Sequence, residues 1–200
     1  MRSVLRIGLV VCFAAAFAAC EQPPEEEIKA AEGALSKAKA AEADVYAEEI
    51  FRSAANTLQD AKDKTEKGEY TEARTAAIEA EERANQSVSQ AETNKAKTRD
   101  DAQAIIDSTS PGLAEARESL SAAPRGKGAD EDLDQLNADL GEAEASLNSA
   151  KGSLENGMLK DALAQAQDAE GKLGGVQDAV KVAMQKIEDW KEENKAWYLR

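Results

Sequence analysis

Apolar residues recur at intervals of three and four along most of the chain, which is the spacing of an amphipathic helix. Polar and charged residues fill the positions between them. Two such stripes flank Gly68, and their members are Ala47, Phe51, Ala54, Leu58 and Ala61 before it and Ala73, Ala77, Ala80, Ala84, Val88 and Ala91 after it. The stretch 51–84 therefore predicts one long helix, a tight turn at Gly68 and a second long helix running back.

The second half of the chain repeats this pattern with larger side chains. One heptad series consists of Leu133, Leu136, Leu140, Ala143, Leu147, Ala150 and Leu154 and stops at Asn156-Gly157. A final series consists of Ala162, Ala166, Ala169, Leu173, Val176, Val180, Ala183, Ile187, Trp190, Asn194 and Trp197. A sustained 3.5-residue period predicts helices that supercoil around each other with a left hand.

The residues around Gly68 support a turn there. Glycine adopts the left-handed conformation that commonly ends a helix. Lys64 and Lys67 precede it and Glu69 and Glu72 follow it, so cations would lie at one helix C-terminus and anions at the next N-terminus.

Other breaks are predicted from helix-stop signals. A first helix covers about 25–43, with Ile28, Ala31, Leu35 and Ala38 on its stripe, and its end near 41–44 is open. The helix after Gly68 is expected to end near Asp107, because Ser110 suits an N-cap and Pro111 the first position of a new helix. A short helix with Leu113, Ala116 and Leu120 then leads to a Pro- and Gly-containing loop before Asp130.

The two hairpins align when the first is shifted by 89 residues. The matched pairs are Ala54/Ala143, Leu58/Leu147, Ala61/Ala150, Lys62/Lys151, Glu66/Glu155, Gly68/Gly157, Ala73/Ala162, Ala77/Ala166, Ala80/Ala169 and Glu81/Glu170. We therefore predict an all-α protein made of two duplicated, long antiparallel helical hairpins that form an elongated, Ala-rich bundle or coiled coil. Unit 1 would cover 27–109, with its turn at Gly68, and unit 2 would cover 110–200, with its turn at Gly157.

The first 19 residues predict an export signal. Arg2 and Arg6 precede a run of 13 uncharged, mostly apolar residues, 7–19, that is too short to span a bilayer. Ala18-Ala19-Cys20 resembles a bacterial lipoprotein signal, in which the cysteine is acylated, carrying palmitate or a similar chain, and becomes the mature N-terminus. Residues 20–26 would then be the acylated N-terminus and a flexible tether. The alternative is an ordinary secretory signal cleaved after Ala18.

Composition removes several function classes. The net charge of −14 disfavours binding to nucleic acid. The chain has no histidine, and its two cysteines, Cys12 and Cys20, both lie in the first twenty residues, so His- and Cys-based catalysis or metal binding is not expected after them. Adjacent carboxylates such as Glu48 and Glu49 lack the cleft that acid–base chemistry needs. We predict no catalytic, cofactor-binding or metal site, and no small-molecule substrate.

A family resemblance adds to this interpretation. The pattern Ala47-x3-Phe51-x2-Ala54-x3-Leu58-x2-Ala61, followed by GEYTEA at 68–73, resembles the bacterial lipoprotein family called domain of unknown function 4398. The resemblance covers about 41–91 and is looser in unit 2. It implies an exported, lipid-anchored helical domain of unestablished activity, so it supplies no active-site residues. By resemblance to enteric lipoproteins, Glu21 in place of aspartate favours the outer membrane, facing the periplasm.

Two functions follow from these expectations. The first is a non-enzymatic, lipid-anchored protein of the bacterial cell envelope that acts as a helical spacer, scaffold or adaptor and either self-associates or contacts other envelope proteins. The alternative is a module that captures a peptide or partner, since Leu58, Gly68-Glu69-Tyr70 and Ala73 weakly resemble tetratricopeptide repeats. The expected functional residue is Cys20, as the acyl acceptor. The C-terminal aromatics have two interpretations: Trp190 and Trp197 cap the open end of the bundle, or Trp190, Trp197 and Tyr198 form a contact patch for another envelope protein.

Overall fold

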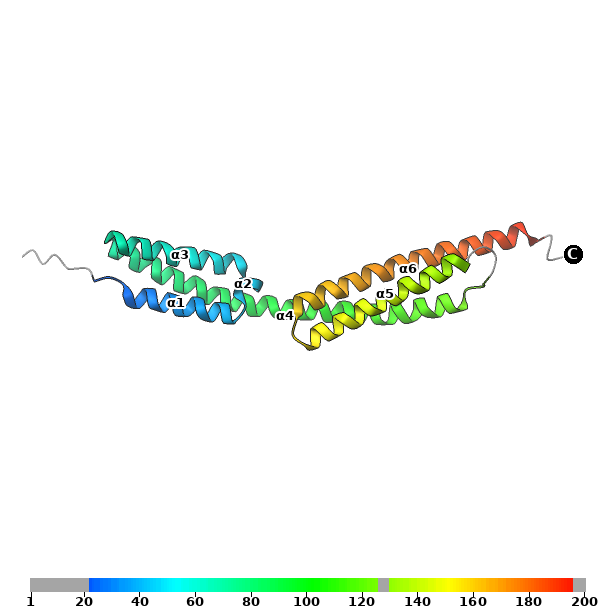
Figure 1. The fold of residues 1–200 in the computed structure, drawn as a ribbon, viewed down its shortest axis with the longest axis horizontal. Coiled ribbons are helices and arrows are strands. Elements are labelled where there is room, and N and C mark those ends of the chain that lie inside the picture. The colour runs from blue at the N-terminus through cyan, green and yellow to red at the C-terminus, as the bar shows by residue number, and fades with distance from the viewer. Residues whose placement is uncertain (1–21, 126–129, 196–200) are drawn as a thin grey trace, which may run out of the picture. The chain divides into compact units, whose positions relative to one another are not determined.

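The computed structural model describes residues 22–125 and 130–195, and in those ranges every regular element is an α-helix (Figure 1). The helices are α1 (Glu25–Ala40), α2 (Ala43–Tyr46), α3 (Glu48–Lys67), α4 (Tyr70–Ala122), α5 (Asp130–Glu155) and α6 (Leu159–Glu193). The predicted all-α fold is confirmed. The chain divides into two compact units, with unit 1 ending at Val88 and unit 2 beginning at Ser89. Helix α4 contributes residues to both units.

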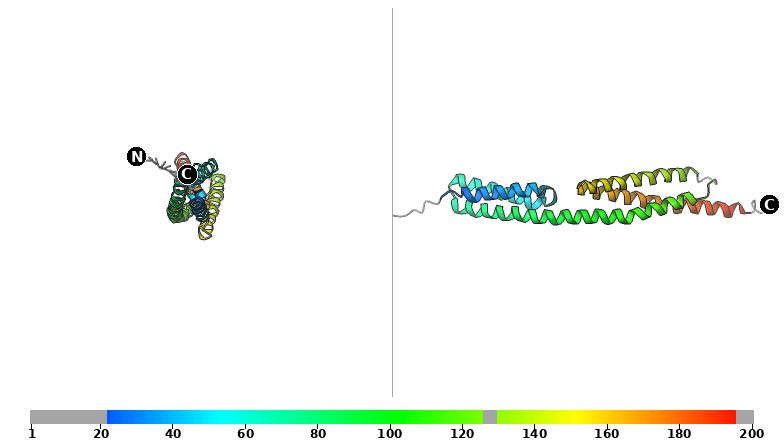
Figure 2. Two further views of the ribbon diagram at one scale, coloured as in Figure 1. Left: turned by 90° about the vertical axis from the view of Figure 1, so that its left-hand side faces the viewer. Right: turned by 90° about the horizontal axis from the view of Figure 1, so that it is seen from below.

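Unit 1 is a three-helix bundle of α1, α3 and the first part of α4 (Figure 2). Its core consists of thin layers, each with one or two side chains from each contributing helix. The buried members of these layers are Ala31, Leu58 and Ala80 in one, Ala34, Ala54 and Ala84 in the next, and Ala61, Ala76 and Ala77 in a third. Residue numbers rise along α1 and α4 as they fall along α3, so α3 runs antiparallel to both.

Unit 2 is also a three-helix bundle, formed by the second part of α4 with α5 and α6. Its buried side chains form one continuous cluster, consisting of Ile106, Leu113, Ala116, Leu120, Ala123, Leu133, Leu136, Leu140, Ala143, Leu147, Ala150, Ala166, Ala169, Leu173, Val176, Val180, Ala183 and Ile187. Hydrogen bonds from Ser153 to Gln165 and from Lys186 to Asp132 show that α5 and α6 are antiparallel.

The two predicted turns have the same backbone geometry. Gly68 and Gly157 are left-handed, with φ of 79° and 76°. The N–H of Gly68 donates to Thr65 O (3.1 Å) and the next N–H to Lys64 O (3.0 Å). The N–H of Gly157 donates to Leu154 O (3.1 Å) and the next N–H to Ser153 O (2.9 Å). Both turns are Schellman motifs, in which two otherwise unpaired helix carbonyls are satisfied.

The hairpins also share their buried seam, as the predicted repeat requires. The paired positions Ala54/Ala143, Leu58/Leu147, Ala61/Ala150, Ala73/Ala162, Ala77/Ala166 and Ala80/Ala169 are all buried. The predicted seam positions Phe51, Val88 and Leu154 are only half-buried, and Ser87 and Ser153 are buried next to the last two. The Ser87 hydroxyl donates to Ala84 O at 2.7 Å, which satisfies it without a partner helix.

The predicted helix break at 108–111 is wrong, because α4 continues through Pro111. Buried residues follow the same three-and-four spacing on both sides of the proline, from Ile106 through Leu113 to Leu120. Pro111 itself lies on the exposed face. A proline inside a helix costs about 3 kcal/mol, and we infer that the continuous buried seam offsets this cost. Ser110 donates back to Ile106 O at 2.8 Å and is therefore not an N-cap.

The beginning of unit 1 also differs from expectation. Helix α1 begins at Glu25, where the first helix was predicted to begin, so the predicted tether through residue 26 is too long. Pro24 is fully buried, and its carbonyl accepts the Ile28 N–H at 3.0 Å. The sequence left the end of the first helix undecided. The helix ends at Ala40, and Glu42, just before α2, adopts a left-handed φ of 60°. The division between the compact units lies between Val88 and Ser89, whereas the sequence suggested 109/110.

Candidate functional site

The residues predicted from sequence as functional fall at the two ends of the chain. Cys20, Trp197 and Tyr198 lie outside the described residues. Trp190 lies in α6, three positions after Ile187, and is half-buried. Its carbonyl accepts hydrogen bonds from the backbone and side-chain nitrogens of Asn194, at 3.1 and 2.8 Å. The described part of the predicted aromatic patch is thus one residue at the end of a helix.

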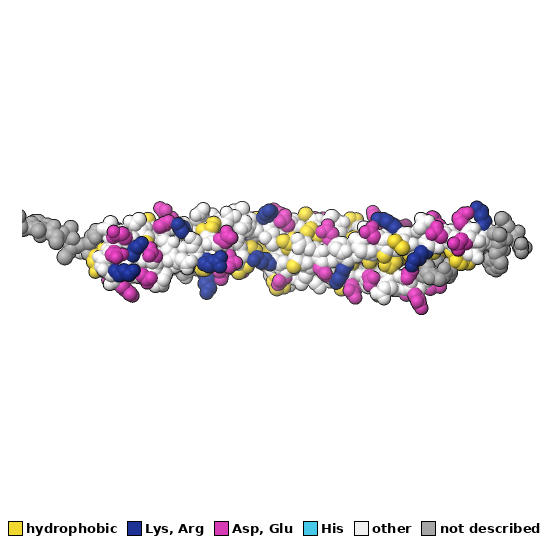
Figure 3. Space-filling model, turned by 90° about the horizontal axis from the view of Figure 1, so that it is seen from above, with side chains coloured by type: hydrophobic (Ala, Val, Ile, Leu, Met, Phe, Trp, Pro, Cys, Tyr) yellow, Lys and Arg dark blue, Asp and Glu magenta, His cyan; other side chains and the backbone are white. Residues whose placement is uncertain are grey.

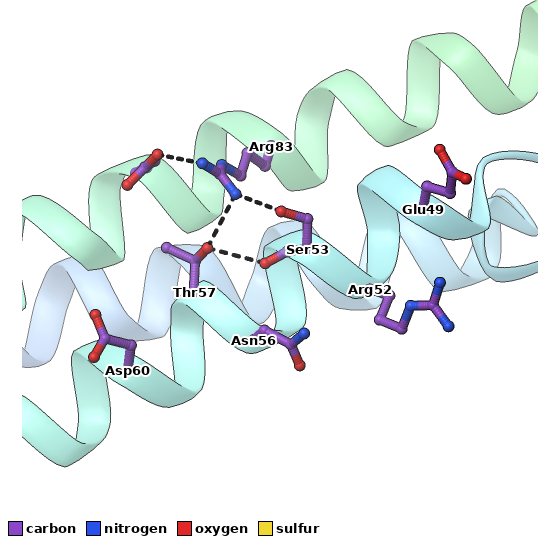
Figure 4. A pocket seen from close by; sticks show the side chains of 8 residues that line it. Glu49, Arg52, Ser53, Asn56, Thr57, Asp60 and Arg83 are labelled. Atoms are coloured by element: carbon purple, nitrogen blue, oxygen red, sulfur yellow. Dashed lines mark hydrogen bonds and ion pairs between the residues drawn. The ribbon is translucent and has the colours of Figure 1, made fainter.

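Unit 1 has a polar hollow of about 440 Å³ between α3 and α4 (Figure 4). Arg83 reaches across it from α4 and donates to the hydroxyls of Ser53 and Thr57 on α3. A second nitrogen of Arg83 donates to Glu79, one turn back on α4. The Thr57 hydroxyl in turn donates to Ser53 O at 2.9 Å. These bonds hold α3 and α4 in register.

Two further charged groups of this hollow, Asp60 and Arg52, also have partners within the chain. Asp60 accepts from Lys64 at 2.6 Å, and Arg52 lies 3.6 Å from Glu48. The pKa of Lys64 is raised, chiefly because its ammonium donates this hydrogen bond to the Asp60 carboxylate. Paired charges of both signs select neither an anion nor a cation, so the hollow has the character of a structural contact.

Unit 2 has an apolar groove between α4 and α6, which we call the α4–α6 groove. Two adjoining hollows of about 200 and 440 Å³ form it. The α4 wall has the small residues Ala116, Ser119 and Ala122 together with Glu115. The α6 wall has two larger apolar residues, Val180 and Met184, among the polar side chains of Gln177, Lys181, Gln185 and Glu188. The sequence analysis did not identify this groove. The available signal was the run of small residues spaced by three along α4.

The start of unit 1 is held by a set of contacts that we call the N-terminal clamp, formed by Gln22, Pro24, Glu27 and Arg74. Arg74 on α4 donates from Nε to Glu27 Oε1 at 2.7 Å and from Nη2 to Gln22 O at 3.2 Å. A backbone hydrogen bond at the helix N-terminus, followed by the Arg74 guanidinium, lowers the pKa of the Glu27 carboxyl. One arginine therefore ties both the first turn of α1 and the chain before it to α4.

The described residues offer little for metal or membrane chemistry. Over 22–125 and 130–195, no group of three or more acidic, histidine or cysteine side chains is placed to hold a metal ion. None of the helices in those ranges combines the length and the hydrophobicity that a membrane-spanning segment needs. On the face drawn in Figure 3, acidic and basic side chains are interspersed, and hydrophobic side chains lie scattered between them.

Comparisons of the chain with protein-family models, with curated proteins and with solved structures give no match. The resemblance to the lipoproteins of domain of unknown function 4398 therefore stays a prediction. At the level the structure defines, the chain is an all-α protein of two three-helix units.

Proposed function

We propose that this chain is a non-enzymatic lipoprotein of the bacterial cell envelope, a helical scaffold or spacer anchored through acylated Cys20. The observation that carries the proposal is that each unit fills its own seam. In unit 1, Ala31, Ala54 and Ala80 are fully buried. In unit 2, Leu133, Leu140 and Ile187 are each no more than 2% exposed. When the apolar stripes of the helices are buried within each unit, the exposed surface is mainly charged and polar. Such a surface suits a structural role more than capture of an apolar ligand.

The anchor follows from the sequence. A short apolar run ends in Ala18-Ala19-Cys20, and no other cysteine follows it in the chain. Acylation with several chains would hold the protein firmly to a bilayer. The expected location is the outer membrane, facing the periplasm, and the expected partners are the lipid bilayer, other envelope proteins or further copies of the chain.

Mass spectrometry of the full chain expressed in a bacterium tests the anchor. The expected mature protein begins at Cys20 and carries the added mass of its acyl groups. Cys20→Ala should release the protein from the membrane fraction, whereas the matched variant Cys12→Ala should not. A mature N-terminus at Ala19, with an unmodified Cys20, would disprove the proposal and support ordinary secretion.

Capture of a partner in the α4–α6 groove is the second candidate, favoured by the apolar lining of that groove. A photoreactive residue at Ser119, inside the groove, should crosslink a defined partner in cells if this function is correct. The same residue at exposed Ser121 on the same helix serves as the control. Equal crosslinking from both positions would count against the groove as a binding site.

A further inference from the structure

We propose that one end of unit 1, formed by the start of α1 and the α3–α4 turn, lies against the lipid headgroups of the membrane that holds the anchor. This inference rests on the proposed function, specifically on acylation of Cys20. It adds an orientation: the N-terminal clamp leaves Glu21 as the only residue between the acyl acceptor and the first contact with the folded bundle.

The clamp fixes the chain from Gln22 onward. Arg74 holds the Gln22 carbonyl at 3.2 Å and the Glu27 carboxylate at 2.7 Å. Pro24, which lies between Gln22 and Glu27 in the sequence, has a fully buried side chain. The Glu25 N–H donates to Pro23 O at 2.9 Å, which continues the ordered backbone into α1. Each residue from Gln22 to Glu25 thus takes part in a contact or a hydrogen bond of unit 1.

The short connection limits the distance between Cys20 and unit 1. The Cα atoms of Cys20 and Gln22 are two residues apart, so they lie at most about 7 Å from each other. A free segment through residue 26 would instead allow about 25 Å between Cys20 and the first ordered residue. The acyl chains place Cys20 at the bilayer interface, so the clamp keeps the start of unit 1 there as well.

The α3–α4 turn belongs to the same end of the unit. Figures 1 and 2 show the first turn of α1 beside the place where α3 turns into α4. Arg74 lies four positions after Tyr70, the first residue of α4. Its hydrogen bond to the Gln22 carbonyl therefore keeps the chain before α1 close to the start of α4. Lys39, in the last turn of α1, lies about 21 Å along that helix from Glu25.

The chemistry of this end fits contact with headgroups without insertion. The turn residues Lys67, Gly68 and Glu69 are exposed and carry both signs of charge, and exposed Glu25 and Glu26 at the start of α1 add negative charge, which does not favour an anionic lipid surface. The large hydrophobic side chains described as exposed in unit 1 are Val45 and Ile78, and neither belongs to the turn. The anchor, and not charge attraction, therefore sets the orientation, and the fitting partner is a zwitterionic headgroup layer.

Fluorescence quenching in vesicles tests the orientation. The mature chain has no cysteine besides Cys20, so Lys67→Cys and Lys39→Cys each provide a single labelling site. The acylated, labelled proteins are reconstituted in phosphatidylethanolamine–phosphatidylcholine vesicles that carry a headgroup nitroxide. We expect the label at 67 to be quenched several-fold more than the label at 39. Equal quenching, or stronger quenching at 39, would overturn the inference.

Two further variants test the cause. Insertion of six Gly and Ser residues between Glu21 and Gln22 lengthens the connection without altering the bundle, and it should bring the quenching at 67 and 39 closer together. Arg74→Ala should do the same by opening the clamp. Arg52→Ala is the control, since this arginine of unit 1 is exposed and its ion pair with Glu48 lies within α3, and it should leave the quenching ratio unchanged.

The outcomes separate this inference from the proposed function. Mass spectrometry first establishes whether Cys20 is acylated, and an unmodified Cys20 overturns both statements. Acylated protein with equal quenching at 67 and 39, or stronger quenching at 39, overturns the orientation alone. A ratio that stays unchanged after the insertion removes the short connection as the cause of the orientation. An effect of the insertion without an effect of Arg74→Ala removes Arg74 from its positioning role, and circular dichroism of that variant checks that unit 1 is still folded.

Discussion

The two units place their seams at the same repeat positions but fill them with side chains of different size. Near each turn the residues are identical, as in Ala80 and Ala169. Farther from the turn, unit 1 has Ala47, Ala84 and Ser87 where unit 2 has Leu136, Leu173 and Val176, and all six residues are buried.

The difference shows how one heptad supports two kinds of core. Interaxial distance depends on the side chains at the contact, so alanine permits close approach and leucine requires more room. The shared alanines lie where the turn holds two helices close together. Unit 2 gains buried area away from its turn, whereas unit 1 depends on closely packed alanine layers, in which each side chain buries little apolar surface.

The largest expected effect is the loss of a core leucine in unit 2. Leu140→Ala should lower the free energy of unfolding by about 3 kcal/mol, because it removes buried methyl groups and leaves a cavity. Urea titration followed by tryptophan fluorescence measures it, since both tryptophans follow residue 189. The equivalent Phe51→Ala in unit 1 should cost less, because Phe51 is only half-buried. Equal costs would remove the contrast between the cores.

The reverse change tests how tightly unit 1 is packed. Ala84→Leu introduces the residue that unit 2 carries at Leu173, but into a layer with Ala34 and Ala54. We expect a loss of about 2 kcal/mol from overpacking, seen in urea titrations by circular dichroism. The exposed Ala40→Leu is the control and should change stability by less than about 0.5 kcal/mol. A stabilised Ala84→Leu protein would mean that the alanine layers contain unused space.

The turn glycines should respond alike in the two units. Gly68→Val and Gly157→Val should each cost about 1 kcal/mol or more, because a β-branched residue resists a positive φ. Gly141→Ala is the control, since this glycine lies inside α5 with free space around it, and it should gain up to about 1 kcal/mol. An unchanged melting temperature in either valine variant would contradict the importance of that turn.

Replacing one buried hydroxyl of unit 2 should increase the free energy of unfolding. Thr109 is 2% exposed, and its Oγ1 has no hydrogen-bond partner. Thr109→Val keeps the shape and removes the polar atom, so we expect a gain of about 1 kcal/mol in urea titrations. Buried Ser87, whose hydroxyl is satisfied, is the comparison in α4, and Ser87→Ala should not stabilise. A loss on Thr109→Val would indicate that the hydroxyl is solvated.

The smallest expected effects are pH-dependent and occur once in each unit. The pKa of Glu27 is lowered by a backbone hydrogen bond and then by Arg74, and that of Asp168 by the Ser146 hydroxyl and then by Lys172. A carboxyl whose pKa is lower in the folded state stabilises the fold above its unfolded pKa, near 4.5 for Glu27 and 3.8 for Asp168. That contribution disappears as pH falls through the folded pKa.

Carboxyl NMR titration measures both groups directly. Arg74→Ala should raise the pKa of Glu27 and leave Asp168 unchanged, and Lys172→Ala should do the opposite. A Glu27 pKa unaffected by Arg74→Ala would mean that the helix N-terminus alone lowers it.

Local sequence signals predicted the hairpins because those signals act over a few residues. Gly68 and Gly157 specify the turns, and seam spacing predicted nearly every buried position of α5 and α6. Where a local signal competed with packing, prediction failed: Pro111 implied a break, but buried residues on both sides keep α4 continuous. Ser87 replaced Val88 in the seam because its hydroxyl is satisfied within its own helix.

The candidate sites also differ in whether they depend on local sequence or on contacts between distant residues. Cys20 is predicted as an acyl acceptor from a short motif, since an export signal is read as a linear sequence, and it stays a prediction. The N-terminal clamp could not, because Arg74 and Gln22 are 52 positions apart and nothing in either neighbourhood indicates the other. The α4–α6 groove likewise requires two distant segments to pack side by side.

The sequence alone determined the helical class, the turn positions, the repeated seam and the predicted anchor, since periodicity, glycine conformation and a linear motif are properties of neighbouring residues. Only the tertiary structure decided that each hairpin is completed by a third helix, that α4 contributes to both units, and that Arg74 holds Gln22 and Glu27 against α4. Those features depend on contacts between residues far apart in the chain, whose packing can outweigh a proline's local cost and hold a segment that composition alone makes flexible.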